Sequence, residues 1–377
     1  MDYKGSVTTT VRSTPRDDGF SMPAEWAPHD RTWMAWPERP DTWREGAGPV
    51  REAFVAVAEA IAASEPVVVT ASPGQVDGAR RALPAGVDVV ELATDDAWMR
   101  DIGPTFVLDE RGGRRGVDWV FNAWGGATAG LYAPWDRDDA AAARILELEG
   151  ADRYRAPFVL EGGAVHTDGE GTVLVTEQCV LDPHRNRGWT RATAEEALCR
   201  YLGAERVVWL GRGVVDDETR GHIDNLACFI RPGVVALTWT DDRDDPQYPI
   251  SLDARRRLEE ATDARGRPIE VRLLHQPGPL HRREEEAAGL VPSAAAVTRR
   301  AGERLAGSYV NSYIATTRVV VPLLDQRHDD AALAAFESWF PDRRIVGVPA
   351  REILLGGGGI HCITQQVPTP RVPEGKA

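Results

Sequence analysis

The feature that most constrains the fold is a recurring unit of two extended runs around a turn, an amphipathic helix and a further apolar strand. Repetition of one supersecondary unit predicts a radial or stacked arrangement instead of one open sheet. Four units read as complete along the central part of the chain. They span 105–121, 137–149 and 158–160; 164–175, 191–201 and 206–210; 228–239, 251–264 and 269–274; and 309–323, 329–339 and 344–348.

A fifth unit forms only if the two ends of the chain meet. Residues 32–36, a helix near 50–64 and residues 66–70 supply most of it, and a strand around Cys362–Gln366 completes it. Hairpins mixed with β–α–β segments at this spacing favour an α/β fold with radial repetition. The pattern therefore predicts five units arranged around a centre.

The domain organisation that we predict is simple. Residues 1–19, rich in Thr, Ser, Asp and Arg, are expected to form a disordered N-terminal tail. Residues 369–377 are expected to form a C-terminal tail. Residues 20–368 contain no low-complexity linker, so we expect one continuous catalytic domain.

Composition narrows the choice of partners and compartment. The formal net charge of −14 disfavours binding to nucleic acid or anionic membranes and mildly favours cationic small molecules. No run of 18 apolar residues and no secretory leader is found, so we expect a cytoplasmic protein. The four cysteines form no CxxC pair, which argues against a zinc site or a disulfide framework.

Polar residues without an obvious structural need gather in four places. These are Asp95–Pro104, Glu161-Gly-Gly163, Gly221-His-Ile-Asp-Asn225 and the glycine run 356–359 that precedes Ile360-His361-Cys362. If the third and fourth segments enter strands, His222 and Asp224 project on one face, and His361 points away from Cys362. A thiol, an imidazole and several carboxylates suit nucleophilic attack on a cationic carbon. Carboxylates pair with guanidinium in a planar fork, and Trp98 can stack on such a cation.

Each of these residues also has an ordinary structural interpretation. Cys362 can be a small buried apolar residue, and His222 a hydrogen-bonding residue without a catalytic role. Asp96 can occupy a turn, Arg100 and Asp101 can form a simple ion pair, and Glu161 can end a strand. Spacing alone leaves these alternatives open.

Taken together, the motifs resemble the agmatine deiminases over about 22–366. The resemblance is carried by Met22-Pro-Ala-Glu-Trp-Ala-Pro-His29, Trp33-Met-Ala-Trp-Pro37, Trp98-Met-Arg-Asp-Ile-Gly-Pro-Thr105, Phe121-Asn-Ala-Trp-Gly-Gly126, Glu161-Gly-Gly163, Asp168-Gly-Glu-Gly171, Thr176-Glu-Gln-Cys179, Gly221-His-Ile-Asp-Asn225, Asp245-Pro-Gln-Tyr248, Ser308-Tyr-Val-Asn311 and Ile360-His-Cys-Ile-Thr-Gln-Gln366. It implies a five-bladed α/β propeller, the pentein fold of the peptidyl-arginine deiminase-like branch. It also implies hydrolysis of agmatine to N-carbamoylputrescine and ammonia without metal or organic cofactor, by a homo-oligomer.

The resemblance also assigns roles to residues. It implies that Cys362 is the nucleophile and His222 the general acid and base. Asp96 and Asp224 would bind the guanidinium, and Glu161 would pair with the histidine.

Three positions depart from the family pattern and bear on the substrate. Gly359 stands where the family commonly has Asn, and Glu218-Thr219-Arg220 where it commonly has Asp-Thr-Asn. Glu218 can still serve the second cation of agmatine. Arg220 would repel that cation if it points inward, or welcome a substrate carboxylate, and it is harmless if it faces solvent.

Alternatives to agmatine hydrolysis therefore remain at this point. They are deimination of another guanidino compound such as free or peptidyl arginine or a specialised metabolite, amidine transfer to an amine, and a non-catalytic pentein that only binds. The combination of Asp96, His222, Asp224 and Cys362 argues against the last of these.

Overall fold

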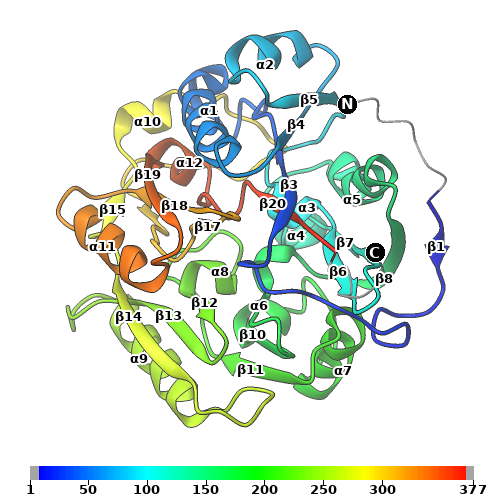
Figure 1. The fold of residues 1–377 in the computed structure, drawn as a ribbon. Coiled ribbons are helices and arrows are strands. Elements are labelled where there is room, and N and C mark those ends of the chain that lie inside the picture. Colours follow the sequence, from blue (N-terminus) through cyan, green and yellow to red (C-terminus); the bar gives the residue numbers. More distant parts are fainter. Residues whose placement is uncertain (1–7, 371–377) are drawn as a thin grey trace.

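The computed structural model describes residues 8–370 and has a mixed α/β architecture. Within this range, five sheets of three or more strands surround a central region, and the longer helices lie on the outside of the ring (Figure 1). The α/β prediction is confirmed, and the circular arrangement is compatible with the predicted propeller.

Each of the five sheets contains the same core of three strands. Two strands pair antiparallel, a helix follows, and the next strand returns parallel to the second, which is the predicted unit. The strands and helix of each unit, in chain order, are β6 Thr105–Asp109, β7 Arg114–Val120, α5 Asp136–Glu149 and β8 Asp152–Val159; β9 His166–Thr167, β10 Thr172–Thr176, α7 Arg191–Leu202 and β11 Arg206–Leu210; β12 Ala227–Arg231, β13 Val234–Trp239, α9 Gln247–Glu260 and β14 Glu270–His275; and β17 Tyr313–Ile314, β18 Arg318–Leu323, α11 Asp329–Trp339 and β19 Arg344–Pro349.

The fifth unit joins the two ends of the chain, as predicted. Strand β20 (Gln365–Pro368) pairs antiparallel with β3 (His29–Ala35), so that Gln365 lies opposite Trp33. After β3, helix α1 (Gly48–Ala62) leads into β4 (Val67–Ala71), which runs parallel to β3. Figure 1 shows the red end of the chain beside the blue β3.

The remaining elements are short or lie at sheet edges. They are β1 Thr10–Val11, β2 Phe20–Ser21, β5 Asp88–Glu91, β15 Leu280–His281, β16 Arg304–Leu305, η1 Arg44–Ala47, η2 Gly162–Ala164, α2 Val76–Ala82, α3 Met99–Ile102, α4 Gly126–Ala129, α6 Glu177–Val180, α8 Ile223–Leu226, α10 Glu284–Ala288 and α12 Arg351–Leu355. No helix within residues 8–370 has the length and apolar character needed to cross a membrane.

The predicted tails are wrong in part. Strand β1 adds to the first of these sheets, where Thr10 lies opposite Arg153 of β8, so residues 8–19 belong to the fold. The segment is ordered although its composition is polar, because its backbone pairs with β8. The Asp18 carboxylate also accepts a hydrogen bond from Tyr154 at 2.8 Å. Residues 1–7 and 371–377 lie outside the described range, whereas the backbone N–H of Thr369 donates to Pro28 at 2.8 Å.

One helix begins earlier than its sequence pattern predicts. Helix α9 starts at Gln247 instead of 251 and contains Pro249 in its first turn. A proline is tolerated there because the first N–H groups of a helix have no helical acceptor. The Asp245 carboxylate accepts the N–H of Gln247 at 2.8 Å and supports this start.

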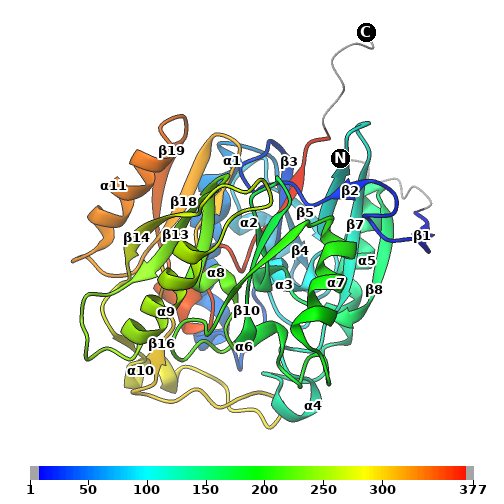
Figure 2. The ribbon, with the colours of Figure 1, turned by 90° about the horizontal axis from the view of Figure 1, so that it is seen from below.

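A long irregular segment crosses one end of the ring. Residues 289–303, called the strap below, run from α10 towards α4 and return to β16 (Figure 2). The strap is held to the opposite side by backbone bonds, from Ala133 to the carbonyl of Ala295 and from Val297 to that of Leu131, both 2.8 Å. It carries Arg299 into the interior.

Candidate active site

The Cys362 thiol lies in a turn between α12 and β20. The prediction that it enters a strand is therefore wrong, since residues 360–363 form a turn and β20 begins at Gln365. The glycine run before it allows close packing and one positive φ, +108° at Gly357. The residue is 2% exposed.

Two polar side chains contact the Cys362 sulfur. The Asn311 amide donates to Sγ at 3.1 Å, and Sγ lies 3.5 Å from Asp224 Oδ2. The side-chain oxygen of Asn311, Oδ1, in turn accepts the backbone N–H of His361 at 3.0 Å. Asn311 thus fixes both the sulfur and the turn that carries it.

His222 and Asp224 lie at the start of the short helix α8, and the predicted extended strand is wrong. His222 is the residue that precedes α8, and Asp224 is in its first turn. The bend arises because Gly221 has a φ of +100° and the Asp217 carboxylate accepts the N–H groups of Gly221 and His222 at 3.1 and 3.0 Å. Asp217 therefore holds the loop that presents the imidazole.

A buried glycine marks the place where the two side chains meet. A Cβ on Gly163 would lie 2.5 Å from His222 Nδ1 and 2.9 Å from Asp224 Oδ2. Within residues 8–370, His222 Nδ1 and Asp224 Oδ1 are buried without a hydrogen-bond partner. A buried polar atom without a partner is costly, so both atoms are suited to a ligand.

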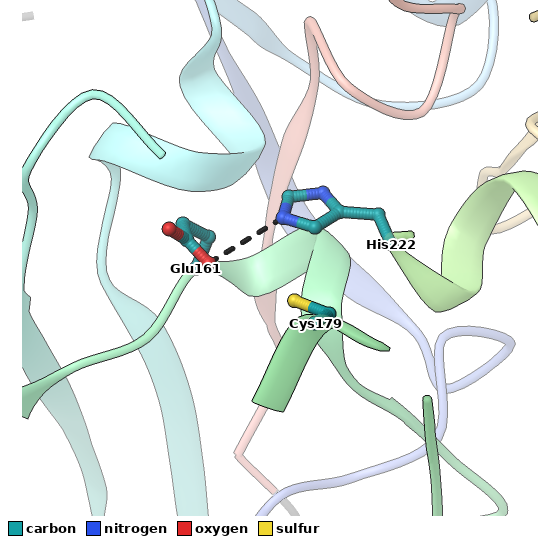
Figure 3. Close-up of side chains that lie close together, drawn as sticks. All are labelled: Glu161, Cys179 and His222. Carbon is teal, nitrogen blue, oxygen red and sulfur yellow. Dashed lines mark hydrogen bonds and ion pairs between the residues drawn. The ribbon is translucent and has the colours of Figure 1, made fainter. Parts of the chain in front are cut away.

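Glu161, Arg185 and Cys179 surround the other side of the imidazole. His222 Nε2 lies 3.4 Å from Glu161 Oε2, and Figure 3 shows this pair with Cys179 beside it. Arg185 Nε donates to both Glu161 oxygens at 2.9 Å and Arg185 Nη2 to the Thr219 carbonyl at 2.6 Å. Glu161 does follow the end of strand β8, but it also orients His222.

Glu161, Cys179 and His222 lie close enough together to be considered as ligands of a metal ion. Ligand atoms of Glu161, Cys179 and His222 lie within 4.8 Å of one another. However, Arg185 already occupies both carboxylate oxygens, so a dication would lie against a guanidinium. The set fits a histidine that carries a proton better than it fits a metal ion.

Asp96 is held by the indoles of Trp43 and Trp98. Its carboxylate accepts from Trp43 Nε1 at 2.8 Å and from Trp98 Nε1 at 3.1 Å. A Cβ on Gly358 would lie 2.5 Å from the Trp98 ring and 3.1 Å from Cys362 Cβ, so Trp98 lies close to Cys362. Trp98 therefore links Asp96 to the thiol.

Burial and nearby carboxylates shift the pKa values of Cys362, His222 and Asp101. Burial, Asp224 and Asp101 raise the pKa of Cys362 well above its usual value, so the group is a neutral thiol. Burial lowers the pKa of His222, but Asp101 and its other neighbours raise it well above the usual value in total. Burial raises the pKa of Asp101 to about 6. Cys362 is therefore a neutral thiol and His222 an imidazolium.

The three positions that depart from the family pattern have different surroundings. The Glu218 carboxylate forms a fork with Arg299 of the strap at 2.6–3.2 Å. A Cβ on Gly359 would lie 2.3 Å from Asn311 Oδ1, so Asn311 fills the space of a side chain there. Arg220 donates to Asp182 at 2.9 Å in a surface groove instead of joining the buried cluster.

Several residues of the site were not assigned a role from the sequence. Asn311, Asp101, Glu25 and Cys179 all lie inside segments that carry the resemblance, which was the available signal. Asp101 does not pair with Arg100: it accepts from Gly163 and from Trp124, both at 2.9 Å. His361 does not point away from the cluster, since Nδ1 lies 2.9 Å from Asp224.

A family model described as Porphyromonas-type peptidyl-arginine deiminase matches residues 21–368. The chain is a member of this family, in the branch that contains the agmatine deiminases. An agmatine deiminase of Pseudomonas aeruginosa is 54% identical over 361 residues, 95% of this chain and 98% of the relative. One of Ectopseudomonas mendocina is 53% identical over 365 residues, 96% and 99% of the two chains.

Superposition on a solved structure supports the same family assignment. The agmatine deiminase of Enterococcus faecalis superposes with a TM-score of 0.93 at 46% identity, covering 96% of this chain and all of that one. All the motifs that carried the resemblance lie within the residues that the family model matches, 21–368.

Proposed function

We propose that the chain hydrolyses agmatine to N-carbamoylputrescine and ammonia through a covalent adduct on Cys362. The observation that carries the proposal is the meeting of His222 and Asp224 at Gly163, with Asp224 also 3.5 Å from the Cys362 sulfur. Support for the substrate comes from the relatives named agmatine deiminase at 53–54% identity.

Substrate binding would use the carboxylates that flank the sulfur. Asp224 Oδ1, which lacks a partner within residues 8–370, is free to accept a guanidinium N–H, and Asp96 would receive another. Two-point pairing fixes the plane of the cation and aims its carbon at the sulfur. The indole of Trp98 would line the cation's path.

Adduct formation would begin when the cation reaches the thiol. A positive charge beside Cys362 lowers its pKa, so substrate binding helps to form the thiolate. The sulfur then attacks the guanidinium carbon, and His222 delivers a proton to the departing nitrogen. The carbon–nitrogen bond breaks and the nitrogen leaves as ammonia with the proton from His222. The ammonia also takes up the proton that the thiol has lost, so that ammonium departs, and a neutral His222 and an S-alkylthiouronium remain.

Hydrolysis would complete the cycle. His222 takes a proton from a water that attacks the same carbon, the carbon–sulfur bond breaks, and the ureido product leaves while Cys362 is regenerated. Glu161, whose pKa is lowered by Arg185 and His222 against the effect of burial, remains a carboxylate and keeps the imidazole oriented. General acid–base catalysis of this kind contributes on the order of 10²–10⁴-fold.

The test is an ammonia-release assay over agmatine, free arginine and a peptidyl-arginine, with Cys362→Ala as control. We expect agmatine to be the preferred substrate and the variant to be inactive. A large preference for arginine would overturn the substrate assignment. Unchanged turnover by Cys362→Ala would overturn the mechanism. A ureido product formed in plain buffer argues against amidine transfer.

We also propose that residues 20–368, together with residues 8–19 that add strand β1 to them, act as one catalytic domain, in the cytoplasm and as a homo-oligomer. The family model spans nearly the same residues, and all four cysteines are free, as suits a reducing compartment. The oligomer rests on the resemblance alone. A light-scattering mass equal to one chain, about 41 kDa, would refute it.

A further inference from the structure

A buried chain of polar groups leads away from the Cys362 sulfur through Asp224. The Oδ2 atom of Asp224 lies 3.5 Å from Cys362 Sγ and 2.9 Å from His361 Nδ1, and His361 Nε2 lies 2.7 Å from Glu25 Oε1. The side chains of Asp224, His361 and Glu25 are at most 3% exposed. The imidazole of His361 is thus enclosed between two carboxylates.

Both ring nitrogens of His361 lie within hydrogen-bond distance of a carboxylate oxygen, so the imidazole must carry two protons to donate to both. A neutral imidazole has one N–H and can donate to only one of the two carboxylates. Burial and Arg100 lower the pKa of His361, but Glu25 and Asp224 outweigh them and raise it. Burial raises the pKa of Asp224, yet His361 and other neighbours bring it below the usual value. An imidazolium therefore lies between two carboxylates.

The far end of the chain is anchored by further groups. Arg100 Nη1 lies 3.4 Å from Glu25 Oε1, and Arg100 Nε donates to the His361 carbonyl at 3.4 Å. His166 accepts the Phe229 N–H at Nδ1, so its Nε2 faces Glu25 Oε2, at 3.5 Å, as a donor. The pKa of Glu25 lies well below its usual value because His361 and Arg100 outweigh burial. Burial raises the pKa of the adjoining Cys228, which stays neutral.

The two oxygens of Asp224 differ in a way that matters for binding. His361 engages Oδ2, whereas Oδ1 is buried without a partner within residues 8–370. A carboxylate held at one oxygen by a fixed imidazolium cannot rotate, so its other oxygen stays aimed at one place. The positive charge of His361 also offsets part of the repulsion between Asp224 and a thiolate at Cys362.

We propose that His361 is a positioning residue, anchored by Glu25, that fixes Asp224 so that its free oxygen accepts the substrate guanidinium. This inference rests on the proposed function and adds to it a residue that touches no substrate. It predicts that loss of His361 weakens the binding of a cation more than it lowers the intrinsic reactivity of the Cys362 sulfur.

The first test compares His361→Asn with the wild type. The shorter amide can still donate to Asp224, but it lacks the charge and the bond to Glu25. We expect kcat/KM for agmatine to fall at least 100-fold, with KM rising at least tenfold. Alkylation of Cys362 by 2-chloroacetamidine, a cation, should slow at least tenfold, while alkylation by neutral iodoacetamide should change less than threefold.

Glu25→Gln supplies a second variant that keeps the imidazole. A glutamine stabilises the imidazolium less, so the pKa of His361 falls. We expect KM for agmatine to rise with pH between 6 and 9 in this variant more steeply than in the wild type. His275→Asn, which removes a solvent-exposed histidine 2.8 Å from Asp241, is the matched control and should leave both measurements unchanged.

The outcomes separate the two proposals. Wild-type enzyme without activity on agmatine would overturn the proposed function, whatever the variants do. With that activity present, a cationic-to-neutral alkylation ratio unchanged in His361→Asn would overturn the positioning role. If His361→Asn fails to fold, a pH profile of Glu25→Gln equal to that of the wild type overturns it instead.

Discussion

The buried guanidinium of Arg299 forms a fork with the carboxylate of Glu218 at the edge of the site. Arg299 Nη2 and Nε lie 2.6 and 3.0 Å from its oxygens, and the Arg299 side chain is 4% exposed against 24% for Glu218. A Cβ on Gly357 would lie 2.5 Å from the same carboxylate. The ion pair therefore joins the strap to the loop that carries Glu218, and Arg299 Nη2 also donates to the Gly356 carbonyl, at 3.1 Å, in the turn that leads to Cys362.

The first prediction concerns this ion pair. Glu218→Gln removes the carboxylate that pairs with Arg299, so that Asp96 and Asp41 are left to offset this positive charge, and KM for the cationic agmatine should rise about tenfold, equivalent to about 1.4 kcal/mol. Steady-state kinetics at low and moderate salt measure it. The double variant Glu218→Gln with Arg299→Gln removes both charges and should recover most of the loss. Equal KM values in all three proteins would contradict the prediction.

The second prediction uses the gap at Gly163. Gly163→Ala places a methyl group 2.5 Å from His222 Nδ1 and 3.0 Å from Asp101 Oδ1, where a reacting group must fit. We expect kcat for agmatine to fall at least 100-fold. Gly74→Ala, where an added Cβ meets nothing within 4 Å, is the control and should retain full activity. An active Gly163→Ala protein would mean that the reaction occurs elsewhere.

The third prediction concerns the charge state of the nucleophile. Because the pKa of Cys362 is raised well above its usual value, the resting enzyme has little thiolate at pH 7.5. A cationic 2-chloroacetamidine should therefore alkylate Cys362 at least 100-fold faster than neutral iodoacetamide does. Peptide mass spectrometry resolves the sites, and half-buried Cys199 serves as the internal comparison with no such preference. Similar rates of both reagents at Cys362 would show a pre-formed thiolate.

The fourth prediction links pH to stability through Asp138. Burial raises the pKa of this carboxyl to about 8, whereas an unfolded aspartate titrates near 4. The folded protein thus holds a proton that the unfolded chain releases, so this residue lowers the stability progressively as pH rises from about 4 to about 8. Asp138→Asn removes the effect.

The measurement is the midpoint of thermal unfolding, Tm, at pH 5 and pH 8. The gain in Tm of Asp138→Asn over the wild type should be larger at pH 8. The asparagine oxygen can still accept the Asp95 N–H, which Asp138 Oδ1 does at 2.7 Å. The same Tm difference at both pH values would show that Asp138 is already charged at pH 5.

The strands were predictable because apolar runs and turn residues carry their own signal. Strand β11 matches the predicted range 206–210 residue for residue, and β13 and β18 end at residues 239 and 323, where the predicted extended runs end. The loops at the site were harder, since their shape comes from contacts distant in sequence. The carboxylate of Asp217 bends the segment before His222, and Asn311 holds the turn at Cys362. The side-chain directions predicted from strand alternation were therefore wrong at His222 and His361, since neither residue lies in a strand.

The roles of paired charges were equally invisible in the sequence. Arg220 looked able to enter the pocket, but Asp182, 38 residues away, holds it at the surface. Arg100 and Asp101 are neighbours in sequence, yet Arg100 lies against Glu25, and Asp101 against Trp124. Which charges meet depends on the assembled ring.

The pairing of β20 with β3 gives synthesis of this protein a definite order. Cys362 lies three residues before β20, whereas β3 has left the ribosome more than 300 residues earlier. A nascent chain can build most of the ring, but its nucleophile arrives with the strand that closes it. The thiol therefore meets its carboxylates only in a nearly finished polypeptide, so incomplete translation products lack a working reaction centre.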